Sequence, residues 1–561
     1  MLGFFHVNRN IRSIRRSRQI IRVLLTYGFD HLLDMMGLST VVARGRRILR
    51  RSESLIARMH PAVRVRLAME ELGPTFIKLG QLLSTRPDLI PRTYLVELSK
   101  LQDDVPPVPF AQIETQLAGE LGERYDSLFR SIAPEPIAAA SIAQVHGAIL
   151  HDGTPVVVKV RRPGIVETVD TDIDLMLAFA HLAERHIPEL SIYDPVGVVR
   201  EFARTIRREM ELAREGRTIE KFRDNFQGDP MLVFPKVYWE GTSPGVLTME
   251  RIDGIKVSDI HSLDTAGCDR KLIALTGARA FLRMVVDHGF FHGDPHPGNV
   301  MILPGNRICL LDYGMVGRLD DHLREYLADI LLAIVNRDVD GIIAILLSSG
   351  EISEPVETRR LRRELSEFID SYYEVSLKEL EVGKLLLDFI EIITTFRIRL
   401  QPDFILLAKA LVTVEGMGRQ LDPDFDMISV LKPFMLGVVK QRLDPKHFMA
   451  TLEETGRSYL SLLKALPRDI REFVGKLNRN SFKIDLEHRG LERFIRELDK
   501  SMNRLSFSLI ISALIIGSSI VMQIDKGPKF MGFPIFAFAG YLTAVVIGFW
   551  WIIAILRSGK L

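Results

Sequence analysis

The chain has almost no cysteine and almost no excess charge of either sign. Cys268 and Cys309 are the only cysteines among 561 residues. This pair excludes a cysteine-based zinc motif and a disulfide framework, and it fits a reducing compartment. Lys and Arg number 73 and Asp and Glu number 71, which leaves a net charge of only +2. The sequence therefore lacks a global basic field, and we expect no nucleic-acid partner.

Two stretches near the C-terminus contain no charged residue. They span 20 residues at 505–524 and 27 residues at 530–556. At about 1.5 Å per residue, about 20 helical residues cross a hydrocarbon core of about 30 Å. We therefore predict two transmembrane helices within 505–556, joined by a link of five polar residues. Two buried core helices are the alternative interpretation.

Basic residues flank the outer ends of this predicted hairpin. They are Arg493, Arg496, Lys500, Arg504, Arg557 and Lys560, whereas the link contains only Lys526 and Lys529. Positively charged residues favour the cytoplasmic side of a membrane. The body of the protein is therefore expected in the cytoplasm.

The N-terminus does not resemble a secretory signal. Arg22 interrupts the apolar run at 20–25, and no cleavage-site pattern follows. Five arginines precede that run: Arg9, Arg12, Arg15, Arg16 and Arg18. A basic amphipathic helix on an anionic membrane and a solvated helix face both fit this pattern.

Residues from about 40 to 130 are predicted to be helical, because apolar residues recur at spacings of three and four. The tract at 73–81 interrupts this pattern with Gly73 and Pro74. It predicts a turn into a helix that carries Lys78 and Gln81 on one face. The three-residue spacing of Lys78 and Gln81 alone favours two solvent-exposed side chains without a function.

The middle of the chain holds four segments in the order that phosphoryl transfer needs. The first contains Ile137, Ala138, Ala139, Ala140, Ser141, Ile142, Ala143, Gln144 and Val145. A strand, a turn at 151–154 and a second strand at 156–160 follow. Small residues let a loop approach phosphates closely, and Lys159 would project a fixed cation toward the same place. Alone, this segment predicts only strands and a loop.

The second segment is acidic and predicted to be helical. It spans 208–215 and contains Glu209, Glu211 and Glu215. A kinase-like site needs a helix glutamate to hold the strand lysine. Glu209 and Glu211 do not share a helical face, so at most one of them can hold Lys159. By pattern alone, a solvated helix is favoured.

The third and fourth segments supply oxygen ligands. His292, Asp294 and Asn299 match the kinase catalytic loop His-x-Asp-x-x-x-x-Asn. Asp294 can accept a hydroxyl proton or orient a nucleophile, and the Asn299 carboxamide can bind Mg²⁺. Asp312 begins Asp-Tyr-Gly after an apolar strand and is a second hard-oxygen ligand.

Two further interpretations concern the same region. His292 and His296 could instead belong to a transition-metal site, although no third nitrogen or sulfur ligand is evident nearby. The segment 246–254 fits a strand and hinge between two lobes, where an adenine would lie. The ordered combination of segments nevertheless predicts a kinase-like nucleotide site that uses ATP and Mg²⁺.

On these motifs the chain resembles the UbiB family, the bacterial ubiquinone-biosynthesis members of the ADCK-type atypical kinases. The motifs are Lys78-Leu79-Gly80-Gln81, Ala138-Ala139-Ala140-Ser141 and the segment 292–299. The resemblance extends from about residue 73 to residue 424. Together the three motifs are highly specific.

The resemblance implies roles for several residues. Lys78 and Gln81 would lie on a helix over the nucleotide cleft, where an ordinary kinase binds its peptide. The alanine-rich segment 137–145 would replace a glycine-rich loop. The family's Glu-x-Asp element maps onto 209–211, which adds Glu209 to the predicted catalytic set. Glu211 departs from the family's aspartate, and this puts a direct role for it in doubt.

We therefore expect an α+β, protein-kinase-like fold with two lobes. Its expected parts are a helical N-terminal extension at 1–117, an N-lobe at 118–253, a helical C-lobe at 254–500 and two transmembrane helices at 505–556. The expected protein is a membrane-anchored atypical kinase or ATPase of the bacterial inner membrane that binds Mg-ATP. The resemblance implies that it supports ubiquinone biosynthesis by acting on lipid precursors.

Alternative functions stay open at this point. The string His-Gly-Asp-x-His-Pro-Gly-Asn also resembles aminoglycoside and choline phosphotransferases, which predicts a small-molecule kinase. A nucleotide-sensing scaffold for other quinone-biosynthesis enzymes is a third possibility. The expected partners are membrane lipids, isoprenoid quinone precursors and those enzymes.

Overall fold

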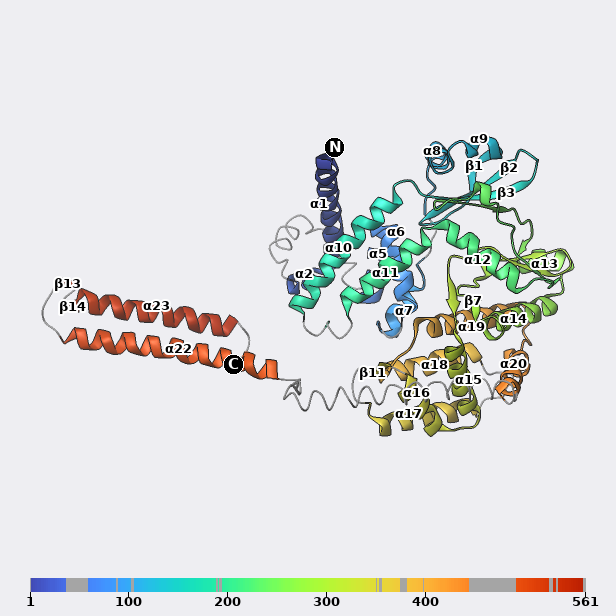
Figure 1. Cartoon of the computed structure of the whole chain (residues 1–561). Coiled ribbons are helices and arrows are strands. Elements are labelled where there is room, and N and C mark those ends of the chain that lie inside the picture. Colours follow the sequence, from blue (N-terminus) through green and yellow to red (C-terminus); the bar gives the residue numbers. More distant parts are fainter. Residues whose placement is uncertain are drawn as a thin grey trace, which may run out of the picture. The chain divides into compact units, whose positions relative to one another are not determined.

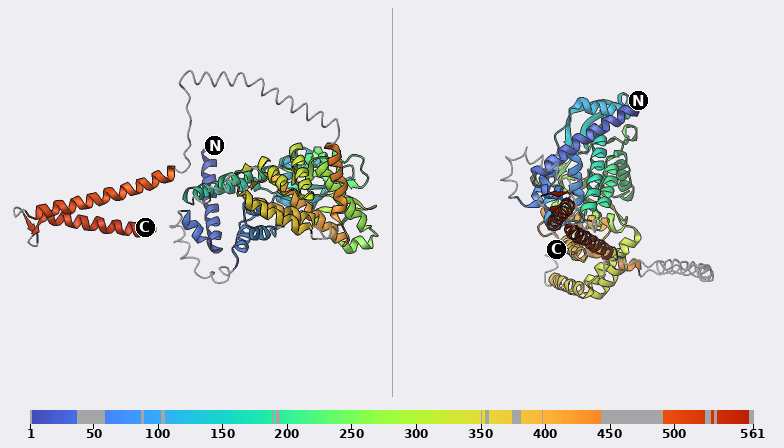
Figure 2. Two further views of the ribbon diagram at one scale, coloured as in Figure 1. Left: turned by 90° about the horizontal axis from the view of Figure 1, so that it is seen from below. Right: turned by 90° about the vertical axis from the view of Figure 1, so that its left-hand side faces the viewer.

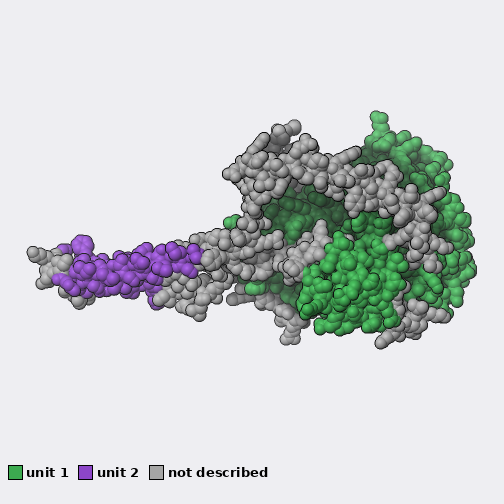
Figure 3. Space-filling view, turned by 60° about the horizontal axis from the view of Figure 1, so that its bottom comes forward, with its two compact units in different colours: residues 1–448 green, residues 449–561 purple. Residues whose placement is uncertain are grey.

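The computed structural model forms two compact units, Met1–Phe448 and Met449–Leu561 (Figure 3). The residues that the structure describes are 2–36, 59–86, 89–101, 105–187, 190, 194–349, 351–352, 356–373, 381–396, 398–442, 491–523, 528–530 and 533–557. The first unit holds two four-stranded sheets, and the second holds two long helices. This mixture of helices and antiparallel sheets agrees with the expected α+β class.

Seven helices in the described part of the chain open the first unit, and proline or glycine lies at the ends of several of them. They are α1 (Leu2–Thr26), α2 (Asp30–Met35), α5 (Pro61–Leu72), α6 (Pro74–Leu83), α7 (Arg92–Leu98), α8 (Phe110–Leu121) and α9 (Arg124–Leu128). Pro61 and Pro74 occupy the first positions of α5 and α6, where a helix needs no N–H donor. Gly73 separates these helices at a φ of +91°, which favours glycine. The predicted turn into a helix with Lys78 and Gln81 is confirmed.

The first sheet is antiparallel, with the strand order β1-β2-β3-β5. Its strands are β1 (Phe129–Ala139), β2 (Ala143–Leu150), β3 (Pro155–Arg161) and β5 (Val246–Glu250). The predicted turn before β3 is confirmed, with Gly153 at a φ of +87°. Val156 and Val158 are buried in one cluster with Ile113 of α8. Because side chains alternate along a strand, Lys159 points to the opposite face.

A second group of helices packs beside this sheet around one apolar cluster. It combines α1, α5 and α6 with α10 (Ile165–His186) and α11 (Pro195–Glu209), all on one side of the sheet in Figure 1. Its buried members include Ile20, Val23, Leu72, Phe76, Ile142, Ile173 and Phe202. Ile142 belongs to the alanine-rich segment. The tip of that segment therefore shares a core with α6.

The second sheet has the order β4-β9-β8-β6. Its strands are β4 (Leu232–Val233), β6 (Ile255–Lys256), β8 (Val300–Leu303) and β9 (Arg307–Leu310), and a separate pair comprises β7 (Phe290–His292) and β10 (Val316–Arg318). Strand β4 precedes residue 254, where the second lobe was expected to begin, yet it pairs in parallel with β9.

Helices pack beside this second sheet and continue below it in the view of Figure 1 (Figure 1, Figure 2). They are α12 (Leu212–Asn225), α13 (Ile260–Thr265), α14 (Arg270–Val286), α15 (Asp321–Val335), α16 (Val339–Ser349), α17 (Thr358–Tyr373), α18 (Val382–Thr395), α19 (Pro402–Leu421) and α20 (Met427–Arg442). Short turns and strands complete the unit: η2 (Trp239–Gly241), η3 (Pro297–Asn299), β11 (Glu351–Ile352) and β12 (Ile398–Arg399). One large apolar cluster extends from α12 to α20.

The second unit consists of α22 (Leu491–Met522) and α23 (Ile535–Arg557), with a short hairpin of β13 (Lys529–Phe530) and β14 (Phe533–Pro534) between them. Ser519 Oγ lies 2.5 Å from the hydroxyl oxygen of Tyr541. Gly540 faces the Ser518 side chain so closely that a Cβ there would clash. Small residues thus let the two helices approach each other.

One helix in the described part of the chain is long and apolar enough to cross a membrane. Its apolar part, Leu505–Met522, has a mean hydropathy of 2.2 over 18 residues, whereas Ile535–Trp550 is a shorter apolar helix. The predicted link of five residues was wrong, because α22 ends at Met522 and α23 begins at Ile535. The β-hairpin occupies part of this longer link, and α23 starts directly after Pro534.

Candidate active site

Lys159 lies at the centre of a network of ion pairs. From β3 it donates to both carboxylate oxygens of Glu215, at 2.9 and 2.8 Å. Its Nζ atom also lies 3.6 Å from Asp312 Oδ1. Glu215 accepts a further hydrogen bond from the N–H of Tyr313 at 3.3 Å. One buried carboxylate therefore ties the first sheet to the Asp-Tyr-Gly segment.

The charges in this network stabilise one another. Burial lowers the pKa of Lys159, but the carboxylates of Asp312 and Glu215 outweigh it, so the pKa is raised overall. The Lys159 ammonium holds the pKa of Asp312 well below its usual range, with burial opposing this and the N–H of Gly314 assisting it. Lys159 is therefore a cation and Asp312 a carboxylate throughout the neutral pH range.

Of the three glutamates in the acidic segment, Glu215 is the one that holds Lys159. The acidic segment is not one helix, because α11 ends at Glu209 and α12 begins after Glu211. Glu211 is partly exposed and pairs with Arg214 and Arg217. Glu215 lies in the first turn of α12, which packs on β5 beside Lys159. Glu209 at the end of α11 therefore pairs with Lys78, whereas Glu215 in α12 pairs with Lys159.

Helix α6 reaches the same network. Lys78 Nζ lies 2.5 Å from Glu209 Oε1, and the Lys78 side chain is largely buried. After Lys159, its charge also contributes to the lowered pKa of Asp312. Gln81 instead donates to the carbonyl oxygen of Leu101 at 3.2 Å. The structure therefore brings Lys78 and Glu209 to the ion-pair network, while Gln81 fixes α6 to the segment after α7.

The loop 292–299 follows directly from β7. His292 Nδ1 accepts a hydrogen bond from the N–H of Asp294 at 3.2 Å, and its Nε2 contacts the carbonyl oxygen of Asp312. Burial lowers the pKa of His292. The N–H of Leu311 donates to the carbonyl oxygen of Asn299 at 2.9 Å. These bonds place Asn299 beside the residue that precedes Asp312.

The side chains of Asn299 and Asp312 fit a hard divalent cation. Among the described residues, the Asn299 carboxamide has no hydrogen-bond partner, and Asp312 is half exposed with one oxygen bonded to the N–H of Gly314 at 3.0 Å. Carboxylate and amide oxygens are the donors that Mg²⁺ prefers.

The structure adds no further ligand to the transition-metal site that His292 and His296 suggested, among the residues that it describes. In the part of the chain that the structure describes, no group of three or more His, Cys, Asp and Glu could hold a metal ion. His296 Nδ1 accepts from the N–H of Gly298 at 3.1 Å and so shapes its own loop.

The alanine-rich segment forms a shorter loop than its length implied. Ile137, Ala138 and Ala139 end β1, and Ala143, Gln144 and Val145 begin β2, so Ala140, Ser141 and Ile142 alone form the tip. Arg162 Nε donates to the carbonyl oxygen of Ala140 at 2.8 Å. Gln144 exchanges hydrogen bonds with the backbone of Val108, at 2.8 and 3.2 Å. The loop is therefore braced from both sides.

The connection between the two sheets matches the predicted strand and hinge. Strand β5 covers Val246–Glu250, and residues 251–254 lead into β6. A Cβ atom on Gly254 would lie 2.8 Å from the carbonyl oxygen of Ile302. Glycine is therefore required where the connection crosses β8.

One cation in this site, Lys409, is absent from the residues predicted from the sequence. Lys409 of α19 has its Nζ atom 3.7 Å from Asp294 Oδ1, with the two side chains 38% and 42% exposed. The same helix covers the loop, because a Cβ on Gly293 would lie 2.8 Å from Leu406. The available signal was a single charged residue in the otherwise apolar run 404–412.

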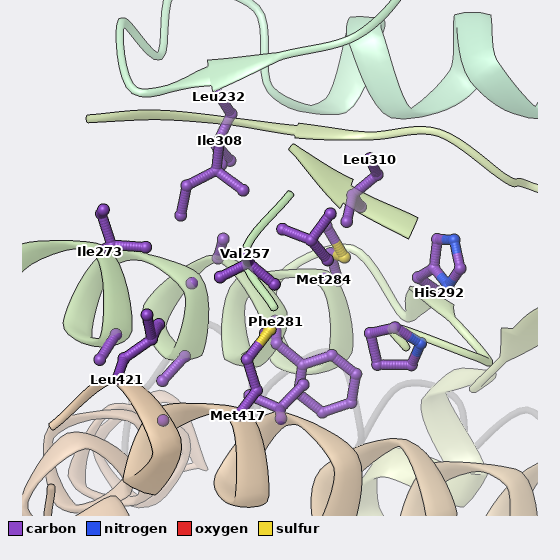
Figure 4. A pocket seen from close by; sticks show the side chains of 18 of the residues that line it. Leu232, Val257, Ile273, Phe281, Met284, His292, Ile308, Leu310, Met417 and Leu421 are labelled. Atoms are coloured by element: carbon purple, nitrogen blue, oxygen red, sulfur yellow. The ribbon is translucent and has the colours of Figure 1, made fainter. Parts of the chain in front are cut away.

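An apolar cavity of about 40 Å³ lies under the loop 292–299 (Figure 4). Figure 4 shows Phe281 and Met284 of α14 and Met417 of α19 around it, with His292 at its edge. Because both ring nitrogens of His292 already have partners, this space offers a ligand no free polar group. The cavity belongs to the packing that supports the loop.

Comparison with protein families gives three matches along the chain. The model described as ABC1 atypical kinase-like domain matches residues 100–346. The UbiB helical domain matches residues 365–426, and the ABC1/UbiB kinase-like C-terminal domain matches residues 489–557. The first match contains Lys159, Glu215, Asp294 and Asp312, and the second contains Lys409.

Curated relatives cover most of the chain. A protein from Azotobacter vinelandii named "Probable protein kinase UbiB" is 37% identical over 79% of this chain and 83% of its own length. An uncharacterized protein from Clostridium pasteurianum is 33% identical over 98% of this chain and 100% of its own length. A Mycobacterium tuberculosis structure, a complex with erythromycin, matches at 24% identity with a TM-score of 0.46, over 65% of this chain and 93% of that one.

Proposed function

Because the chain belongs to the UbiB family of ABC1 atypical kinase-like proteins, we propose that it is a membrane-anchored ATPase or kinase that binds Mg-ATP and supports isoprenoid quinone biosynthesis. The observation that carries this proposal is the contact of Lys159 with Glu215 and Asp312. These three charges come from a strand, a helix and a loop. Protein-kinase-like sites use this combination of a strand lysine, a helix glutamate and a loop aspartate.

Each residue of the site has a task in the proposed chemistry. Lys159, held by Glu215, would bind the phosphates, while Asn299 and Asp312 would hold Mg²⁺. When bound, Mg²⁺ neutralises charge on the β- and γ-phosphates. Asp294 would accept a hydrogen bond from the attacking hydroxyl or water and take its proton as the new bond to phosphorus forms. The bond from phosphorus to the bridging oxygen then breaks, and ADP leaves.

The acceptor is proposed to be water or a lipid-like small molecule and not a protein. Helix α6 supports this view, because Lys78 is tied to Glu209 beside the nucleotide site. A protein hydroxyl would need an open groove to reach the γ-phosphate in line. The apolar helix Leu505–Met522 supports a location in the bacterial inner membrane, where isoprenoid quinone precursors dissolve.

The deciding experiment combines biochemistry and lipid profiling. The purified full chain in detergent is assayed for phosphate release from ATP with and without Mg²⁺, and for transfer to added proteins. A strain that lacks the protein is complemented with wild type or Asp294→Asn, and its quinones and precursors are profiled.

The expected result is Mg²⁺-dependent phosphate release, weak transfer to protein and quinone loss that only the wild type repairs. Full repair by Asp294→Asn would contradict a need for turnover and favour a nucleotide-sensing scaffold. A phosphorylated small product would favour the small-molecule kinase, and strong transfer to protein would contradict the proposal.

A further inference from the structure

We propose that Lys409 is a further catalytic residue, contributed by the helical domain, which contacts the γ-phosphate in the site assigned above. Its ammonium lies 3.7 Å from the carboxylate of Asp294. A nucleophile that donates a hydrogen bond to Asp294 must come close to this ammonium, and so must the phosphoryl group that it attacks. The inference rests on the proposed nucleotide site and adds a residue to it.

The position of Lys409 is set by contacts along α19. At the start of the helix, Asp403 Oδ1 accepts a hydrogen bond from the N–H of Arg318 at 3.0 Å, which fixes α19 to β10. Farther along, the buried Glu415 accepts from the N–H groups of Val382 and Gly383, at 3.2 and 2.8 Å. The helix is thus anchored on both sides of Lys409.

Between these anchors, α19 is buried except on one face. Phe404, Ile405, Leu407, Ala408, Ala410 and Leu411 are all buried, and Leu406 contacts Gly293 of the loop. Lys409 lies on the remaining face, beside Asp294. A helix so fixed holds its lysine with little freedom to leave the site.

The loop itself contributes no cation between Asp294 and Asn299. The intervening residues are Pro295, His296, Pro297 and Gly298, and His296 Nδ1 is a hydrogen-bond acceptor within the loop. Lys159 is already held by two carboxylates. Lys409 lies next to Asp294, so it is placed to stabilise charge that develops on the transferring phosphoryl group, in addition to Lys159.

In the transfer step, Lys409 keeps its protons and acts only by charge and hydrogen bonding. The nucleophile's proton goes to Asp294, the bond to the β-phosphate oxygen breaks, and ADP leaves. A plain surface ion pair, without effect on nucleotide selection, is the alternative. The two cases differ in how the protein distinguishes a triphosphate from a diphosphate.

The test compares Lys409→Met, Lys409→Arg and Lys384→Met in the full chain in detergent. Lys384 is an exposed lysine of α18 and serves as the matched control. Titration calorimetry with Mg²⁺ gives the Kd of ADP and of the slowly hydrolysed AMP-PNP for each protein. Phosphate release from ATP gives kcat, and thermal melts report folding.

A lost charged hydrogen bond to the γ-phosphate predicts that Lys409→Met weakens AMP-PNP binding about 10- to 100-fold. ADP binding should change less than about twofold, because ADP lacks that phosphate. Lys409→Arg should recover part of the loss, and Lys384→Met should behave as wild type.

Two results for Lys409→Met would overturn the role of Lys409. One is an equal loss of affinity for AMP-PNP and ADP, and the other is an unchanged ratio of the two Kd values. A wild-type protein that binds neither nucleotide would overturn the proposed function itself, and this role with it.

Discussion

Arg16 of α1 and Asp172 of α10 form a bidentate ion pair across 156 positions of sequence, with contacts of 2.7 and 2.9 Å. Arg16 also donates to the carbonyl oxygen of Leu72 at 2.7 Å, and its guanidinium lies 5.8 Å from the centre of the Phe76 ring. Asp172 is completely buried. One arginine thus links α1 and α10 to α6, the helix that carries Lys78.

Arg16→Ala should therefore destabilise the first unit strongly. Removing one partner leaves the buried carboxylate of Asp172 without its counter-charge, which costs about 3–5 kcal/mol of unfolding free energy. Thermal unfolding followed by circular dichroism measures the effect. Arg18→Ala, at an exposed position of the same helix, is the control. Equal melting temperatures for both variants would show that the pair contributes little.

Asp312→Asn should abolish stabilisation by Mg-ATP in a thermal-shift assay. The substitution removes a carboxylate from the proposed Mg²⁺ site and one counter-charge from Lys159. The melting temperature without ligand provides the baseline. Undiminished stabilisation by Mg-ATP would refute the assignment of Asp312 as a ligand.

Glu215→Gln should weaken nucleotide binding about 10-fold or more, because Lys159 loses the bidentate partner that orients it. Glu211→Gln is the matched control, since Glu211 is partly exposed and pairs only with arginines among the described residues. Calorimetric titration with Mg-ADP measures both. If the Glu211 variant were the weaker binder, the assignment of the helix glutamate would be mistaken.

The pH dependence of stability should expose the Lys159–Asp312 interaction. The pKa of Asp312 is lowered in the folded protein, first of all by Lys159. Its contribution is therefore present above the unfolded-state pKa of about 3.9 and is lost as the pH falls through the lower folded value. The melting-temperature difference between wild type and Asp312→Asn should stay constant near neutral pH and shrink below about pH 4. A melting-temperature difference that grows as the pH falls would contradict a stabilising contribution from the Asp312 carboxylate.

Cysteine labelling should decide the membrane topology. If both C-terminal helices span the bilayer, a membrane-impermeant thiol reagent added from the periplasm labels Pro528→Cys and leaves Arg557→Cys unlabelled. Both variants are made with Cys268 and Cys309 replaced by serine. Labelling of both positions, or of neither, would show that α22 and α23 do not form a spanning hairpin.

Several parts of the site could be predicted because they depend on local sequence. Alternating valines define β3 and the side of the sheet that Lys159 faces, and an apolar strand leads into Asp312. The helix of Lys78 could be predicted from Gly73 and Pro74 for the same reason. These signals act over a few residues and need no knowledge of the tertiary fold.

Other parts depend on contacts between distant segments. Three glutamates within seven residues were candidates for Lys159, and a break between α11 and α12 gave the contact to Glu215. Lys409 reaches Asp294 only because α19 packs on the loop 292–299, about 115 residues earlier in the chain. Neither spacing nor composition carries that information.

The 156 positions between Arg16 and Asp172 also set an order of events during synthesis. At about 5–20 residues per second, Asp172 leaves the ribosome roughly 8–30 s after Arg16. Throughout that interval the face of α1 with Ile20 and Val23, later buried, has no partner from α10. The apolar core around α1 can therefore close only after α10 has been synthesised.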